Sequence, residues 1–387
     1  MNMSESNNRI WIVIFAMFIL ILSACFGPAA DGGSEAEADC LIKTDQGAVL
    51  TKLNHEKNTA TAIRTEQLDS YKGKSYWNDQ MIFPTEHSIA LVRQNGINDG
   101  MSLVIQDRNF QDMPIEAKTS GSVNCMTVND GKIYLADCSV SESTVYMYDW
   151  DGNLLDTVII DLPDTEFFMI TAMLPDTENG GLWLMCGSLA SMEQGDSPDN
   201  YLIRTNDELQ IENILDLNIS TGSLFSMTQD ENTIYLLQKY SGANAQGEPS
   251  GSNQVLCFDK QAKILNGTLQ LDLEYGQTIN YIPERNELLI RTAPSDMEQK
   301  AWLLFSLNNQ EQSILFQEEE YDKAVSQTPG GFCTYHEGSY WFVCNRSLLK
   351  YDPHTRSTTS YSLQGPAYSD PSGIVFPDQT QPGPPED

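Results

Sequence analysis

The stretch GKIYLADCSVSESTVYMYDWDGNLLDTVIID, residues 131–161, holds three short strands in succession and decides the fold. The first, GKIYLA, is apolar, the second, TVYMYDWDGN, alternates apolar and other residues before a polar turn, and the third is LLDTVIID. Alternation with a period of two, interrupted by turn residues, is typical of antiparallel strands joined as hairpins. The preceding residues SVNCMTV (122–128) supply a fourth strand, so this part of the chain predicts one antiparallel four-stranded unit.

The apolar strand recurs along the chain. Its copies are HSIALV (87–92), GKIYLA (131–136), GLWLMC (181–186), NTIYLL (232–237), NELLIR (286–291) and GSYWFV (338–343). Measured between Ala90, Tyr134, Trp183, Tyr235, Leu289 and Trp341, the spacings are 44, 49, 52, 54 and 52 residues. Four strands in about 50 residues, with no helical period between them, are typical of a β-propeller blade. We therefore expect an all-β fold, a β-propeller of four-stranded blades, with six full units from about residue 75 to 364.

Both ends of the repeat region contain leftover strand patterns. The hairpin AVLTKLNHEKNTATAIRTE (48–66) has the shape of the last two strands of a blade, and SGIVFPD (372–378) can join it. A seventh blade made from both chain ends would close the ring and remove its exposed sheet edges. The sequence leaves six and seven blades open, and the propeller is predicted over residues 46–378.

The N-terminus contains an apolar run, IWIVIFAMFILILSA (10–24), that is short for a membrane span and suits a secretory signal. It ends in Leu22-Ser23-Ala24-Cys25, which resembles the lipobox of bacterial lipoproteins. The resemblance implies a signal peptide over 1–24 and a diacylglyceryl group on Cys25. An uncleaved N-terminal anchor is the alternative, because Arg9 is the one basic residue before the run and Glu5 offsets it. Either reading places the remaining chain on the extracytoplasmic face of the cell membrane.

The segments beside the propeller are polar or small. Residues 25–45 are predicted to form a flexible acidic tether, and residues 379–387 a disordered tail. The whole chain resembles uncharacterised propeller lipoproteins of Gram-positive bacteria. Asp149-Trp150 reverses the WD dipeptide of another propeller family, so that family fits poorly.

The formal net charge is −32, from 22 Lys and Arg against 54 Asp and Glu. Such a surface should repel nucleic acid and anionic lipid, so we expect no nucleic-acid partner. It favours solubility and cationic partners without choosing among them, and we expect a monomer.

The chain has eight cysteines, and lipidation of Cys25 would leave seven. Cys125 and Cys138 flank one hairpin, and Cys333 and Cys344 flank another. With two-residue turns, Cys125 faces Ala136, Cys138 faces Val123 and Cys333 faces Phe342, so the two thiols of each hairpin are diagonal neighbours. Diagonal neighbours lie about 7–8 Å apart, beyond the usual reach of a disulfide. We expect most cysteines to be buried free thiols, and a bridge between blades stays an alternative.

The units differ in length mainly in the connection between their second and third strands. All of these connections lie on the same face of the ring. The longest are SLASMEQGDSPDN (188–200) and SGANAQGEPSGSN (241–253). Function often resides on such loops over a rigid scaffold, so Glu193, Asp196, Asp199 and Glu248 are the candidate ligand-contacting residues. Carboxylates and carbonyls of this kind suit calcium, but we expect solvated loops.

Catalytic motifs are missing from the sequence. His55, His87, His336 and His354 form no HExxH or CxxC-like cluster, and no GxSxG segment occurs. We expect no cofactor and no metal, and a non-catalytic binding or scaffold role at the cell envelope with a protein, peptide or glycan partner. The alternatives are a carbohydrate-active hydrolase or lyase that uses loop carboxylates, and an accessory subunit of a transporter or envelope-assembly complex. Trp183, Trp302 and Trp341 are expected in the core, and Trp150 nearer the surface.

Overall fold

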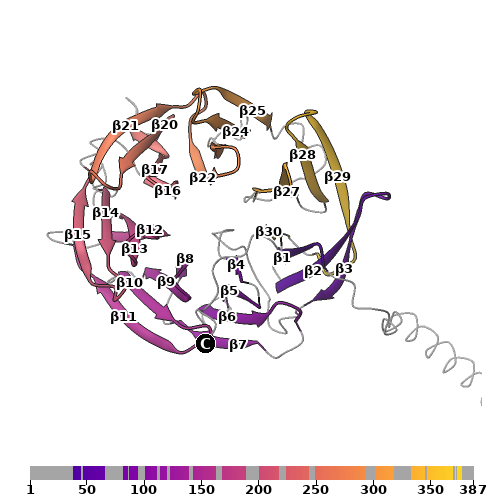
Figure 1. Cartoon of the computed structure of the whole chain (residues 1–387), viewed down its shortest axis with the longest axis horizontal. Helices are drawn as coiled ribbons and strands as arrows, with labels where there is room; N and C mark the ends of the chain where they lie inside the picture. The colour runs from indigo at the N-terminus through magenta and orange to yellow at the C-terminus, as the bar shows by residue number, and fades with distance from the viewer. Residues whose placement is uncertain are drawn as a thin grey trace, which may run out of the picture. The chain divides into compact units, whose positions relative to one another are not determined.

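Short apolar runs separated by tight turns form seven blades of four antiparallel strands within the described part of the chain, and the fold is a β-propeller (Figure 1). The computed structural model describes residues 38–44, 47–65, 82–85, 87–94, 101–110, 114–119, 123–138, 143–162, 168–188, 200–217, 224–243, 249–292, 301–317, 333–344, 347–368, 371 and 373–376. No described segment forms a helix long and apolar enough to cross a membrane.

Six blades are built from strands that follow one another along the chain. Blade 1 contains β4 (Ile82–Pro84), β5 (Ser88–Gln94), β6 (Met101–Asp107) and β7 (Ile115–Lys118). Blade 2 contains β8 (Val123–Asn129), β9 (Lys132–Cys138), β10 (Ser143–Tyr148) and β11 (Leu154–Ile160). Blade 3 contains β12 (Phe168–Pro175), β13 (Leu182–Ser188), β14 (Asn200–Thr205) and β15 (Ile211–Asp216).

The next three blades have the same order. Blade 4 contains β16 (Leu224–Gln229), β17 (Thr233–Gln238), β20 (Gln254–Asp259) and β21 (Ile264–Gln270). Blade 5 contains β22 (Gly276–Ile282), β23 (Glu287–Thr292), β24 (Ala301–Ser306) and β25 (Gln312–Gln317). Blade 6 contains β26 (Cys333–His336), β27 (Ser339–Cys344), β28 (Ser347–Asp352) and β29 (Ser357–Gln364).

Blade 7 combines strands from both ends of the chain. Its order is β30 (Gly373–Val375), β1 (Cys40–Thr44), β2 (Gly47–Asn54) and β3 (Thr59–Thr65). Ile374 pairs with Ile42, so the last described strand is hydrogen-bonded to the first. The propeller therefore has seven blades. The seventh is the mixed blade predicted from the hairpin at 48–66 and the segment 372–378.

The start of blade 7 corrects the sequence prediction of its boundary. Strand β1 lies inside the segment 25–45 that was predicted as tether, and every one of its residues is buried. A strand covered on both faces shows no alternation of apolar and polar residues. CLIKT is also only five residues long, so its sequence gave too short a pattern to recognise.

Blades 6 and 7 are also joined at their outer rims. Strands β29 and β3 pair in parallel, with Ser362 opposite Thr59 and Leu363 opposite Ala60. The backbone N–H of Ser362 donates to the carbonyl of Asn58 at 2.9 Å. This link merges the two blades into one eight-stranded sheet and adds hydrogen bonds beside the point where the chain ends meet.

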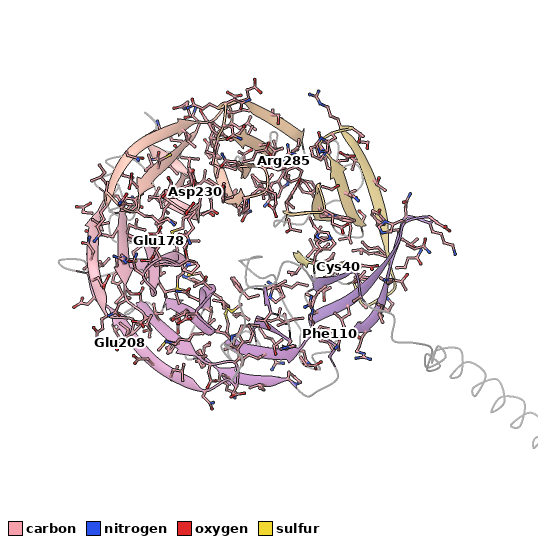
Figure 2. The ribbon with its side chains drawn as sticks, viewed as in Figure 1. Cys40, Phe110, Glu178, Glu208, Asp230 and Arg285 are labelled. Atoms are coloured by element: carbon pink, nitrogen blue, oxygen red, sulfur yellow. The ribbon has the colours of Figure 1, made fainter. Side chains whose placement is uncertain are left out.

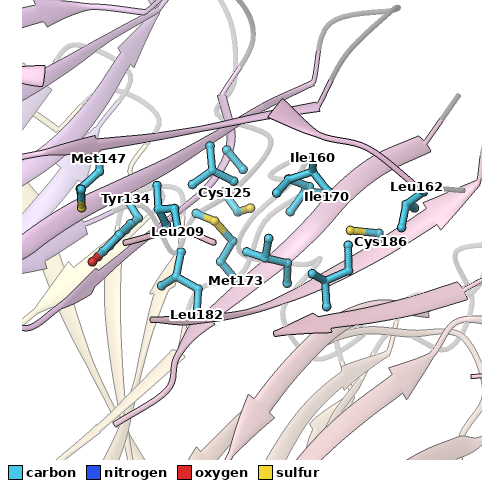
Figure 3. Packing of buried hydrophobic residues seen from close by; sticks show 14 residues of the cluster. Cys125, Tyr134, Met147, Ile160, Leu162, Ile170, Met173, Leu182, Cys186 and Leu209 are labelled. Atoms are coloured by element: carbon cyan, nitrogen blue, oxygen red, sulfur yellow. The ribbon is translucent and has the colours of Figure 1, made fainter. Parts of the chain in front are cut away.

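The core consists of apolar clusters between neighbouring blades, and each blade contributes to two of them. In β23, Leu288 and Ile290 pack against blade 4, while Leu289 packs against blade 6. The cluster between blades 2 and 3 is typical, with side chains from both sheets interleaved (Figure 3). Seven such clusters link blade 1 to 2, 2 to 3 and so on around to blade 7 and back to blade 1.

Turns and bulges fix how the strands of a blade meet. Asp130 and Gly131 both have positive φ, as do Glu337 and Gly338, which matches the type I′ turns that two-residue hairpins prefer. The innermost strands β8, β12, β16 and β22 each contain a register shift near their start. In β8 the shift places Val123 opposite Asp137, so the predicted pairing of Val123 with Cys138 is wrong, because a bulge inserts one extra residue.

Five cysteine side chains are buried in the core and form no disulfide. Cys40, Cys125, Cys186, Cys257 and Cys333 are buried and unbridged, and Cys125 faces Ala136 and Cys333 faces Phe342 as predicted. Burial, reinforced by the charge of Asp230, raises the pKa of Cys257 to about 11. A thiol with a raised pKa is protonated at neutral pH and packs as a small apolar group. Trp150 also contributes to the core between blades 1 and 2, which corrects its expected exposure.

Truncation of a side chain between two blades should destabilise the protein much more than truncation on the rim. Leu182 is fully buried between blades 2 and 3 (Figure 3), whereas Leu154 is 53% exposed. Leu182→Ala should lower the free energy of unfolding by about 2–5 kcal/mol, and Leu154→Ala by less than about 0.5 kcal/mol. Denaturant unfolding followed by tryptophan fluorescence measures both. Equal losses would contradict the assignment of the core to the spaces between blades.

Candidate functional site

The ring has two faces with different connections. The turn face contains the turns between first and second strands and between third and fourth strands of each blade, counted from the centre. The loop face contains the connections between second and third strands and the links between blades. Glu193, Asp196 and Asp199 belong to the connection from β13 to β14, and Glu248 to the connection from β18 (Tyr240–Ala243) to β19 (Pro249–Gly251). All four predicted residues lie outside the described residues.

Part of the loop face is a small sheet rather than an open loop. Strands β18 and β19 pair antiparallel within the segment 241–253 that the sequence predicted as a solvated loop. The segment is rich in Ser, Gly and Asn, residues that are depleted in strands or favour turns, and this composition hid the hairpin. Blade 4 therefore presents an extra hairpin on this face.

Hydrogen bonds and a close ring contact fix the base of this hairpin. Ser252 Oγ donates to Gln238 Oε1 at 2.9 Å, and both residues are buried. The backbone N–H of Tyr275 donates to the Ser252 carbonyl at 3.0 Å. A Cβ on Gly251 would lie 2.4 Å from the Tyr275 ring, so this position requires glycine. The β18–β19 hairpin thus stands on a packed base that also includes Lys239, whose pKa is lowered by burial.

Buried polar side chains occupy the loop-face ends of several second strands. Lys43, Asp137 and Arg291 are 2%, 3% and 5% exposed, and Gln238 is also buried. Burial of a charge costs several kcal/mol unless partners compensate it, and all four residues take part in further interactions. Sequence reasoning missed them, although a charged residue inside an apolar strand, as in CLIKT (40–44), IYLADC (133–138) and LLIRT (288–292), is a recognisable signal.

Several charged groups of the turn face form side-chain contacts in the described structure. Arg204 Nε donates to Asp176 Oδ2 at 2.7 Å and its guanidinium stacks over the Trp183 ring at 5.5 Å. Tyr235 donates its hydroxyl hydrogen to Asp230 Oδ2 at 2.6 Å. In Figure 2, Glu178, Asp230 and Arg285 lie toward the centre of the ring and Glu208 toward its rim.

A third group on this face links blades 5 and 6. Arg285 forms two hydrogen bonds with the Glu287 carboxylate, at 2.7 and 3.0 Å. Tyr340 donates to Glu287 Oε2 at 2.7 Å. Burial and the Glu287 carboxylate raise the pKa of Tyr340 above its ordinary value, with burial the larger cause. These contacts hold turns and neighbouring blades together, so we assign them a structural role.

The histidines and acids do not converge on a metal site in the described part of the chain. Among the described residues, no group of three or more His, Cys, Asp or Glu side chains is placed to hold a metal ion. His336 stacks on Phe376 with ring centroids 3.8 Å apart, and His55 Nδ1 is 2.8 Å from the Tyr361 hydroxyl. Both histidines therefore contact aromatic residues of blade 6 or blade 7.

Comparison with known proteins identifies the fold. No protein-family model and no curated protein matches the chain. A candidate 6-phosphogluconolactonase of Bacteroides uniformis superposes with a TM-score of 0.58 and 13% sequence identity, over 87% of this chain and 99% of that one. The tricorn protease superposes with a TM-score of 0.54 and 10% identity, over 88% of this chain and 34% of that one. At such identity the likeness concerns the fold alone.

The Asp176–Arg204 pair gives a test of the structural role assigned to the turn face. The Asp176 carboxylate is 3% exposed, whereas Glu212, which also contacts Arg204 at 3.3 Å, is 46% exposed. Asp176→Asn should cost about 3 kcal/mol of stability because it removes the buried partner of a charge, and Glu212→Gln less than about 1 kcal/mol. Chemical denaturation measures both values, and equal small losses would show that the buried pair does not stabilise blade 3.

Proposed function

We propose that this protein is a lipid-anchored, extracytoplasmic β-propeller that binds a partner at the cell envelope through its loop face. The lipobox-like residues before Cys25 support the anchor, and the propeller fold supplies the scaffold. The proposed role is non-catalytic, and its partner is a protein, peptide or glycan.

The position of β1 in its blade indicates which face of the propeller the tether joins. Strand β1 is the second strand of blade 7, and second strands begin on the turn face. Asp39, just before β1, contacts Lys52 and the backbone of Leu53 near the β2–β3 turn, which lies on the same face. A tether from Cys25 would therefore enter the propeller on the turn face and leave the loop face free for a partner. The residues between Cys25 and Ala38 can span at most about 45 Å.

Two cysteine variants test the anchor. Cys25→Ala should release the protein from the membrane fraction and remove the mass of the lipid, because the proposed attachment atom is its sulfur. Cys40→Ala is the matched control, since Cys40 is a buried core thiol, and this variant should stay in the membrane fraction. Cell fractionation with intact-mass spectrometry measures both. If Cys25→Ala stays membrane-bound at unchanged mass, the lipid anchor is refuted.

A second pair of variants tests which face binds. A photocrosslinking amino acid at Glu248 would report on the loop face, and one at Glu56, exposed in the β2–β3 turn, on the turn face. In cells, the first should give a discrete crosslinked product with a partner and the second should not, because the partner contacts the loop face. Products from Glu56 with none from Glu248 would contradict the proposed binding face.

A further inference from the structure

The outer edge of β11 is a long strand edge at the rim of blade 2. Its sheet has the order β11-β10-β9-β8, so β11 is terminal, and no other described strand pairs with its outer side. Figure 1 shows β11 running along the outside of the ring. Unpaired strand edges can bind an additional strand, and in blades 6 and 7 the outer strands β29 and β3 already pair with each other.

Aliphatic side chains are exposed along this edge. Leu154, Leu155 and Ile159 are 53%, 48% and 54% exposed. Ile115 of β7 is also exposed and lies against the β10–β11 turn, since a Cβ on Gly152 would be 2.6 Å from Ile115 Cγ2. We call these four residues the β11 patch. Surface aliphatics that gather on one strand and its neighbour mark an interaction site more often than scattered ones do.

A carboxylate holds one backbone donor of this edge. The N–H of Thr157 donates to Asp156 Oδ1 at 2.7 Å, and both residues are exposed. An incoming strand can replace this contact with a backbone hydrogen bond, because the carboxylate remains solvated when released. The edge thus offers main-chain hydrogen bonding together with apolar side-chain contacts, the two components of strand addition.

The segment of the chain that contains β11 carries charges of one sign only. Residues 133–203 contain thirteen Asp or Glu and no Lys, Arg or His, and four of these acids, Asp149, Asp151, Asp156 and Asp161, lie within or beside β11. A field of this kind attracts cations and repels anions. It therefore disfavours a second copy of this chain, whose net charge is also −32, and it disfavours anionic lipid.

We propose that the outer edge of β11 binds an extended segment of a partner protein in which basic and apolar residues alternate. The segment adds a fifth strand to blade 2, places its apolar side chains on the β11 patch and directs its basic side chains to the surrounding acids. This surface lies on the rim, apart from the loop face, and does not depend on the lipid anchor.

A synthetic peptide tests this proposal with the full propeller. The probe is a fluorescent nine-residue peptide that alternates lysine and valine, with binding measured by fluorescence anisotropy. Two control peptides replace lysine by glutamate or carry N-methyl groups on alternate backbone nitrogens. We expect the lysine peptide to bind at least about tenfold more tightly than either control, because one lacks the charge and the other the hydrogen bonds.

Paired variants locate the binding edge. Leu155→Ser with Ile159→Ser should weaken binding of the lysine peptide at least about tenfold. Ile264→Ser with Leu265→Ser is the matched control, because these residues are 56% and 37% exposed on β21, beside Lys260 and Lys263. This control should change binding less than about twofold. The proposal is wrong if the two double variants bind the lysine peptide equally, or if the N-methylated peptide binds as tightly as the lysine peptide. It is also wrong if the lysine peptide does not bind, or if the protein forms dimers that depend on the β11 patch.

Discussion

Burial of both faces of every blade is the constraint on which the rest of the structure depends. Adjacent residues of β23 already show it, since Leu288 and Leu289 enter the cores on opposite sides of blade 5. A blade at the end of an open row would leave one of these faces in water, at about 25 cal/mol for each Å² of apolar area. The chain avoids this cost by closing the ring, and closure requires its two ends to share blade 7.

Closure also determines where function can be placed. The inner strands and the turn face are occupied by packing and by internal pairs such as Arg204 with Asp176 and Tyr340 with Glu287. The β18–β19 hairpin and the connection from β13 to β14 lie on the loop face, where length can vary without disturbing the cores. The chain enters the propeller at the start of β1, on the turn face. The proposed anchor and the proposed binding face therefore lie at opposite ends of the blades.

The sequence predicted the repeat because its signal is strong at each copy. A buried second strand such as IYLA (133–136), with a turn before it, is recognisable at a spacing near 50 residues, and the mixed blade followed from the leftover hairpin. Local deviations were not predictable in this way. A bulge such as that at Val123 changes the register without a change in composition, and β1 is too short for a pattern. Lys43 and Arg291 were missed because their burial depends on neighbouring blades that no single strand reveals.

Unfolding of two truncated chains tests closure by both ends most directly. One lacks residues 373–387 and so loses β30, and the other lacks residues 377–387 and keeps β30 together with Phe376, which packs between blades 6 and 7. The longer truncation should abolish cooperative thermal unfolding or lower the melting temperature strongly, because blade 7 loses its innermost strand. The shorter one should melt like the full chain. If the chain without β30 melts at the same temperature as the full chain, the ring is not held closed by the pairing of its two ends.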